Sequence, residues 1–173
     1  MGFFRGVNVA GHNKVPMVDL RSVLGDAGFG NVATLIQSGN IVFDSPLLDS
    51  KAAAKIHQLV LDSFAVDTPV IVRSRAEIAA ALAVHPWSPG EYEAKFHQIY
   101  FLADTPAPEG EAELAERALD EDVAVIGDEL HVRYRRGQAR SKLTIGLVER
   151  RLRTSATGRN LATVEKVLAL LDG

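Results

Sequence analysis

The chain has 173 residues, a formal net charge of −3 and no cysteine. This length fits one compact domain or two small ones, and it can bury a core without disulfides or metals. The lack of cysteine excludes a disulfide framework, a thiolate nucleophile and any metal site built on Cys. No apolar run is long enough to span a bilayer and no signal-peptide pattern opens the sequence. We therefore expect a cytoplasmic protein with no membrane partner.

The first half of the chain alternates predicted strands and helices in the order β-α-β-β-α-β. Continuous apolar runs predict the strands, and apolar residues at helical spacing predict the helices. A Ser-Gly-Asn turn at 38–40 predicts a hairpin between two of the strands. This order is the ferredoxin-like pattern. The expected elements are strands at 3–9, 32–37, 41–43 and 69–73, and helices at 16–27 and 51–64.

The second half begins at a predicted capping box, in which Ser74 caps a helix and Glu77 reaches back to it. The elements expected after this helix are a strand at 96–103, a helix at 111–119, hairpin strands at 123–126 and 130–134, and helices at 141–152 and 158–171. We therefore predict an α+β fold with two small subdomains. Residues 1–75 form the ferredoxin-like subdomain, and residues 76–173 form a related α/β half that ends in two helices.

The two signs of charge are separated along the second half. Residues 104–129 contain ten acids and one base, whereas residues 131–159 contain nine bases and one acid. One interpretation is that the two segments neutralise each other across neighbouring elements. The other is a basic face at 131–159 that attracts an anion, including nucleic acid. The acidic net charge argues against a generic nucleic-acid binder, so this partner is possible but not favoured.

Two polar, glycine-marked segments of the first half are candidate ligand sites. The first is the loop that enters the first helix, where backbone N–H groups and cationic side chains suit a phosphate or carboxylate. The second is the hairpin turn, which can present amides and a hydroxyl. Both patterns also fit ordinary turns that need Gly and Asn for their backbone angles. The candidate residues are Arg5, Asn8, Asn13 and Lys14 in the loop and Gln37, Ser38 and Asn40 in the turn.

A third candidate segment, Thr157 to Thr163, contains Arg159 and Asn160. Asn160 or Thr157 could cap the last helix. Arg159 is harder to explain there, because a cation opposes the dipole at a helix N-terminus. It is expected either to pair with an acid or to share an anion with that terminus.

The sequence gives few signs of catalysis. His12 is the best candidate acid or base, whereas His57 is expected to face solvent on its helix. No histidines have the spacing of a metal site, and Ser38 lacks the sequence around a hydrolase nucleophile. No metal and no cofactor are therefore expected, and catalysis is left open.

Several motifs follow one another along the chain. They are Arg5-Gly6-Val7-Asn8-Val9, Asn13-Lys14-Val15-Pro16-Met17, Gly28-Phe29, Gln37-Ser38-Gly39-Asn40-Ile41-Val42-Phe43, 69–74, 141–143 and Arg159-Asn160. In these motifs the chain resembles, over essentially its whole length, the bacterial family catalogued as domain of unknown function 1697. The resemblance implies the two-subdomain α+β fold and supplies no activity. It also implies that the polar segments belong together, although this chain has His12 where members often carry Lys.

From these patterns we predict a protein that binds a small anionic ligand, bearing phosphate or carboxylate, in a cleft between the subdomains. Three alternatives stay open. One is an enzyme acting on such a ligand, with Arg5 and Arg159 stabilising charge and Ser38 or His12 moving a proton. Another is nucleic-acid binding through 131–159. The third is a structural or interaction protein in which the motifs only maintain the fold.

Overall fold

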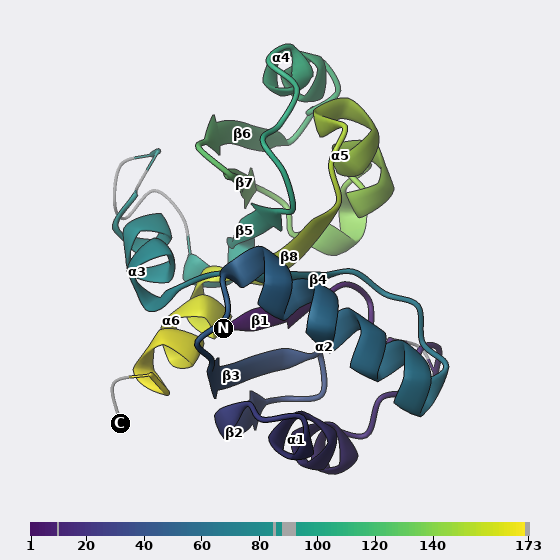
Figure 1. Ribbon diagram of the computed structural model, residues 1–173. Coiled ribbons are helices and arrows are strands. Elements are labelled where there is room, and N and C mark those ends of the chain that lie inside the picture. The colour runs from purple at the N-terminus through teal and green to yellow at the C-terminus, as the bar shows by residue number, and fades with distance from the viewer. Residues whose placement is uncertain (10, 85, 88–92, 172–173) are drawn as a thin grey trace. The chain divides into compact units, whose positions relative to one another are not determined.

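The protein is described here from a computed structural model, which describes residues 1–9, 11–84, 86–87 and 93–171 (Figure 1). The chain divides into two compact units. Unit 1 comprises Met1–Glu77 and Val167–Gly173, and unit 2 comprises Ile78–Lys166. Each unit is built on its own four-stranded antiparallel sheet. The predicted α+β fold with two subdomains is confirmed.

Unit 1 has the predicted order of strands and helices. Its sheet runs β2-β3-β1-β4, so that β1, the first strand in the chain, lies between β3 and β4. This order and connectivity are ferredoxin-like. The elements are β1 (Gly2–Phe4), α1 (Met17–Asp26), β2 (Gly30–Leu35), β3 (Asn40–Asp44), α2 (Asp49–Phe64) and β4 (Val70–Val72).

The two helices of unit 1 pack on one face of its sheet. Leu20 and Leu24 of α1 and Ile56 and Val60 of α2 are fully buried in one cluster with Phe4 of β1. In each helix, apolar residues three or four positions apart form one buried stripe. The periodicity of the sequence therefore predicted both helices. Burial of each such side chain contributes about 1.5–3 kcal/mol. The packed helices therefore hold β1 and the loop that follows it.

Unit 2 repeats the same order of elements. Its sheet runs β6-β7-β5-β8, and its helices α4 and α5 contribute Leu114, Val148 and Leu152 to a core with Tyr100 and Tyr134. The elements from residue 75 onward are α3 (Arg75–Ala83), β5 (His97–Leu102), α4 (Gly110–Ala115), β6 (Glu121–Ile126), β7 (Glu129–Tyr134), α5 (Ile145–Leu152), β8 (Ala156–Asn160) and α6 (Leu161–Ala169). The division between the units falls within α3 and within α6. Over the part of the chain that the structure describes, no helix has the length and apolar character needed to cross a bilayer.

The predicted capping box is present at the start of α3. The Ser74 backbone N–H donates to Glu77 Oε2 at 2.7 Å, and the Glu77 N–H donates to Ser74 Oγ at 3.2 Å. Burial alone would raise the pKa of the Glu77 carboxyl, but hydrogen bonds from Ser74 outweigh it and leave that pKa lowered.

The predicted helix at 158–171 is wrong at its start, where the structure has strand β8. Residues Ala156–Asn160 pair with β5, with Gly158 opposite Tyr100, and the last helix begins only at Leu161. A Cβ at Gly158 would lie 2.7 Å from Tyr100 Cε1. Glycine at this position therefore allows the Tyr100 ring to lie close to the backbone of β8. Unit 2 is therefore β-α-β-β-α-β as well, which the sequence did not predict.

The first strand is shorter than the predicted 3–9. It ends at Phe4, because Gly6 and Asn8 have φ angles of 65° and 55° in the left-handed region, which a strand cannot contain. The segment from Arg5 to Pro16 is instead a long connection from β1 to α1.

Candidate functional site

Asn8 joins two loops of unit 1. Its Nδ2 donates to the carbonyl oxygens of Val15 at 2.9 Å and Gln37 at 2.8 Å, and its Oδ1 accepts from the Val15 N–H at 2.8 Å. Its own N–H donates to the Asn13 carbonyl at 3.0 Å. The β1–α1 loop is thus closed on itself and tied to the β2–β3 turn. We call residues 5–9, 11–16 and 36–40 the loop cluster.

The backbone of the loop cluster is held in uncommon conformations. Asn8, Asn13 and Ile36 have φ angles of 55°, 49° and 53°. Asn tolerates the left-handed region, whereas a β-branched residue such as Ile36 is strained there. Such strain persists only when surrounding contacts fix it, and it concentrates at functional sites. Here the contacts are the bonds made by Asn8 and the bond from Asn13 Nδ2 to the Gly6 carbonyl at 3.2 Å.

Gly39 brings the turn against the β1–α1 loop. It has a φ of 73°, and a Cβ there would lie 2.8 Å from Phe4 Cβ and would clash with Val7. The Phe4 N–H also donates to the Gly39 carbonyl at 2.9 Å. Only glycine satisfies both the backbone angle and the close approach.

Three predicted residues hold the turn and its surroundings. Asn40 is fully buried, and its Nδ2 donates to the Leu35 carbonyl at 3.0 Å and to Ser38 Oγ at 3.1 Å. The Arg5 backbone donates to the Pro69 carbonyl at 3.1 Å, and its own carbonyl accepts from Thr68 Oγ1. Arg5 therefore sits where the loop cluster meets the start of β4.

The loop cluster is electropositive and partly open to solvent. It contains Arg5 and Lys14 and no acidic residue. Lys14 and Gln37 are exposed, as is His12. Arg5 and Ser38 are partly buried.

The remaining two predicted residues, Arg159 and Asn160, belong to unit 2. The Arg159 side chain is 9% exposed, and Nη1 donates to Thr157 Oγ1 at 2.9 Å and to the Gly158 carbonyl at 2.8 Å. Burial lowers the pKa of Arg159 to about 10, so it is still a cation at neutral pH. Asn160 Oδ1 accepts from the Thr163 N–H at 2.8 Å and caps α6, as one interpretation of the sequence predicted.

The basic stretch at 131–159 is largely paired with the acidic segment before it. Asp122 accepts from Arg133 Nε at 2.6 Å and from Arg135 Nη2 at 2.5 Å. The other ion pairs are Arg136–Asp120, Arg151–Glu113 and Arg153–Glu109. These pairs support mutual neutralisation for five of the nine bases of the stretch.

Two buried polar pairs in unit 2 were missed by the sequence reasoning. His97 Nε2 and His131 Nδ1 are 3.0 Å apart, and the hydroxyls of Tyr100 and Tyr134 are 2.6 Å apart. Burial is the main cause that raises the pKa of both tyrosines, so both stay protonated and serve as hydrogen-bond groups. Each pair joins β5 to β7, a pairing that only the strand register reveals.

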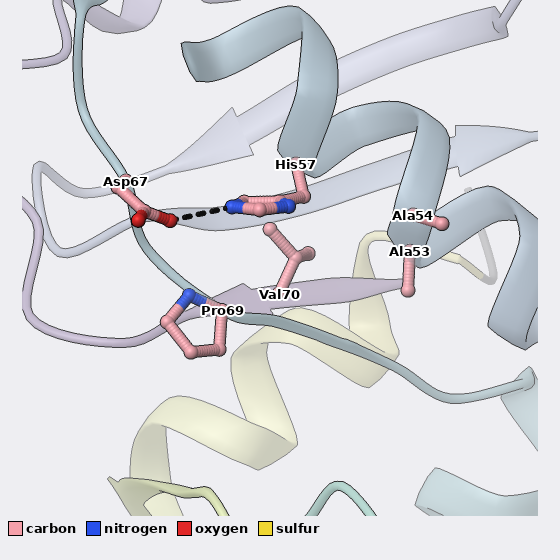
Figure 2. Close-up of a pocket in the computed structure, with 6 residues that line it drawn as sticks. All are labelled: Ala53, Ala54, His57, Asp67, Pro69 and Val70. Atoms are coloured by element: carbon pink, nitrogen blue, oxygen red, sulfur yellow. Dashed lines mark hydrogen bonds and ion pairs between the residues drawn. The ribbon is translucent and has the colours of Figure 1, made fainter.

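A third missed feature is a hollow under α2, which Figure 2 shows. His57, expected to face solvent, has a side chain that is 37% exposed, and its Nε2 lies 2.8 Å from Asp67 Oδ1. The two residues are ten positions apart and on different elements, so no local motif marks them. Within the described residues, no group of three or more His, Asp or Glu side chains could hold a metal ion.

Comparison with known proteins places the chain in a family. The model of the family described as "Protein of unknown function (DUF1697)" matches residues 1–131. The chain belongs to this family. The matched range contains the whole loop cluster and ends before Arg159 and Asn160. No curated protein matches the chain.

A solved structure shares the fold of this DUF1697 protein. It is described as a conserved bacterial protein from Streptococcus pneumoniae, with a TM-score of 0.70 and 20% sequence identity. The match covers 98% of this chain and 96% of that one. At this identity the likeness shows the fold alone, and it supports the two-unit α+β architecture.

Proposed function

We propose that the loop cluster of unit 1 binds a small anionic ligand that carries a phosphate or carboxylate group. The observation that carries the proposal is that the loop cluster contains two cations and no acid, and that hydrogen bonds from Asn8 fix its backbone, parts of which have left-handed angles.

The chemistry of the cluster suits an anion. Arg5 and Lys14 can form charge-assisted hydrogen bonds, which are roughly twice as strong as neutral ones. Gln37 can orient the ligand through its amide. Left-handed residues in a loop also turn successive backbone N–H groups toward a shared point, as in known anion-binding turns.

The cluster divides into two roles. Asn8, Asn13 and Asn40 are positioning residues, because their side chains are bonded to backbone groups of the loops. Arg5, Lys14, Gln37 and Ser38 are the proposed ligand contacts. Rigid positioning lowers the entropy cost of binding. Participation of Arg159 and Asn160 in a shared cleft stays a prediction from the sequence.

Calorimetric titration with pyrophosphate at low ionic strength tests the proposal. We expect saturable binding that weakens about tenfold in Lys14→Gln, since a hydrogen bond to a charged group contributes about 1.5–3 kcal/mol. Lys51→Gln is the matched control, because Lys51 is also exposed but lies in α2, outside the cluster. No binding below about millimolar, or equal loss in both variants, would contradict the proposal.

A further inference from the structure

The hollow in unit 1 lies between α2 and the segment that leads into β4. Its volume is about 290 Å³, and its lining consists of Ala53, Ala54, His57, Asp67, Pro69 and Val70 (Figure 2). This volume is close to the lower end of the range for small-molecule sites. Four of the six residues are small and apolar, so the walls suit one ring or a short branched chain.

One polar pair stands at the hollow. His57 Nε2 and Asp67 Oδ1 are 2.8 Å apart, and a carboxylate accepts, so Nε2 carries the hydrogen. The Asp67 side chain is 80% exposed, and its Oδ2 makes no hydrogen bond within the described residues. One carboxylate oxygen is therefore fixed by the imidazole while the other can accept from a ligand.

The local charge favours a cation. Among the residues that line the hollow, Asp67 carries a negative charge and none is Lys or Arg. Gln58 Nε2 donates to Asp62 at 2.8 Å, which leaves Asp67 as the carboxylate at the hollow itself. The preference is thus opposite to that of the loop cluster.

We propose that this hollow is a second binding site, which takes a small ligand that joins an apolar body to a protonated amine. Asp67 Oδ2 accepts from the ammonium group, and the apolar body packs on Ala53, Ala54 and Val70. His57 is a positioning residue that holds the carboxylate. This proposal is independent of the proposed anion site. Of the three probes used to test it, only the control benzoate is an anion that could bind the loop cluster.

Nuclear magnetic resonance titration of the whole chain with benzylamine at pH 7 tests the proposal, with benzyl alcohol and benzoate as probes of similar shape. We expect saturable shifts at the His57 ring and the Val70 methyls. The affinity should fall in the order benzylamine, benzyl alcohol, benzoate. In Asp67→Asn, benzylamine should weaken about tenfold, to the affinity of benzyl alcohol.

A variant that fills the hollow provides a second test. Ala54→Leu places a larger side chain on an exposed wall of the hollow and should weaken benzylamine and benzyl alcohol alike. Ala80→Leu, on an exposed position of α3, is the matched control and should change neither. Shifts that never saturate, benzoate bound as tightly as benzylamine, or binding unchanged in Asp67→Asn would overturn the proposal. A lowered melting temperature in His57→Gln without any probe binding would show that the pair only ties α2 to β4.

Discussion

At the scale of single residues, Asn8 illustrates how one amide can position a site. It uses both donor hydrogens and its acceptor on backbone groups of two loops. Its left-handed φ of 55° is one that Asn tolerates better than most residues. The sequence marked Asn8 as a ligand contact, which stays a prediction, and the structure adds that its side chain holds the loops in place.

Replacement of Asn8 by Ala should therefore cost stability. The three lost hydrogen bonds predict a decrease of about 3 kcal/mol in the free energy of unfolding, at about 1 kcal/mol each. The free energy of unfolding should decrease less in Asn8→Gly, because glycine adopts the left-handed φ without strain. Urea denaturation of the two variants measures both effects. A decrease of less than about 0.5 kcal/mol in the free energy of unfolding of Asn8→Ala would contradict this role of Asn8 in holding the loops.

Asp122 should make stability depend on pH. The hydrogen bond from Arg135, aided by Arg133, holds the pKa of its carboxyl below the usual value against the effect of partial burial. The stabilisation is present above the unfolded pKa of about 4 and is lost as the pH falls through the lower folded pKa. Asp122→Asn should thus lower the free energy of unfolding by about 1 kcal/mol at pH 7. The gap between the two proteins should narrow at acid pH, and a constant gap in urea titrations would count against this assignment.

At the scale of elements, the sequence predicted those whose signal is local. The helical spacing of α1 and α2, the hairpin at 38–40 and the Ser74–Glu77 capping box all appear as expected. Strand β8 was missed, because its Thr-Gly-Arg-Asn sequence has no apolar alternation and forms a strand only by pairing with β5. The end of β1 was missed because Val7 and Val9 are β-formers, whereas Gly6 and Asn8 between them adopt left-handed angles.

Gly158→Ala distinguishes the strand from the predicted helix. In a helix the change would stabilise the protein by about 1 kcal/mol, because Ala is the best helix former. In β8 the added Cβ meets the Tyr100 ring, so the free energy of unfolding should fall by about 1–3 kcal/mol. Thermal or urea unfolding decides, and a stabilised variant would mean that 156–160 is not a strand.

The sequence located the two turns of the loop cluster but not the contacts between them. Seven predicted residues, from Arg5 to Asn40, belong to the loop cluster, because glycine and asparagine mark turns wherever they occur. Which of them hold the loops depends on contacts between segments that lie 29 positions apart, such as Asn8 and Gln37. The hollow beside His57 was not predicted, since its partner Asp67 is fixed by the path from α2 to β4.

At the scale of the whole molecule, the two units share one topology with different surfaces. Both have the order β-α-β-β-α-β and the corresponding order of strands. Unit 2 neutralises its acidic and basic segments through ion pairs such as Arg151–Glu113 at 2.9 Å. Unit 1 instead keeps a loop cluster that contains cations and no acid. An anion should consequently bind at unit 1 rather than along 131–159.

The most direct test of this account is a backbone amide titration of the whole chain with pyrophosphate, followed by nuclear magnetic resonance. We expect saturable shifts concentrated at residues 6–14 and 37–39, with the amide signals of 131–159 unchanged. Lys14→Gln should reduce the shifts, and Lys51→Gln should not. Saturable shifts confined to 131–159, or none at all in the loop cluster, would contradict the central claim that this cluster is the anion site.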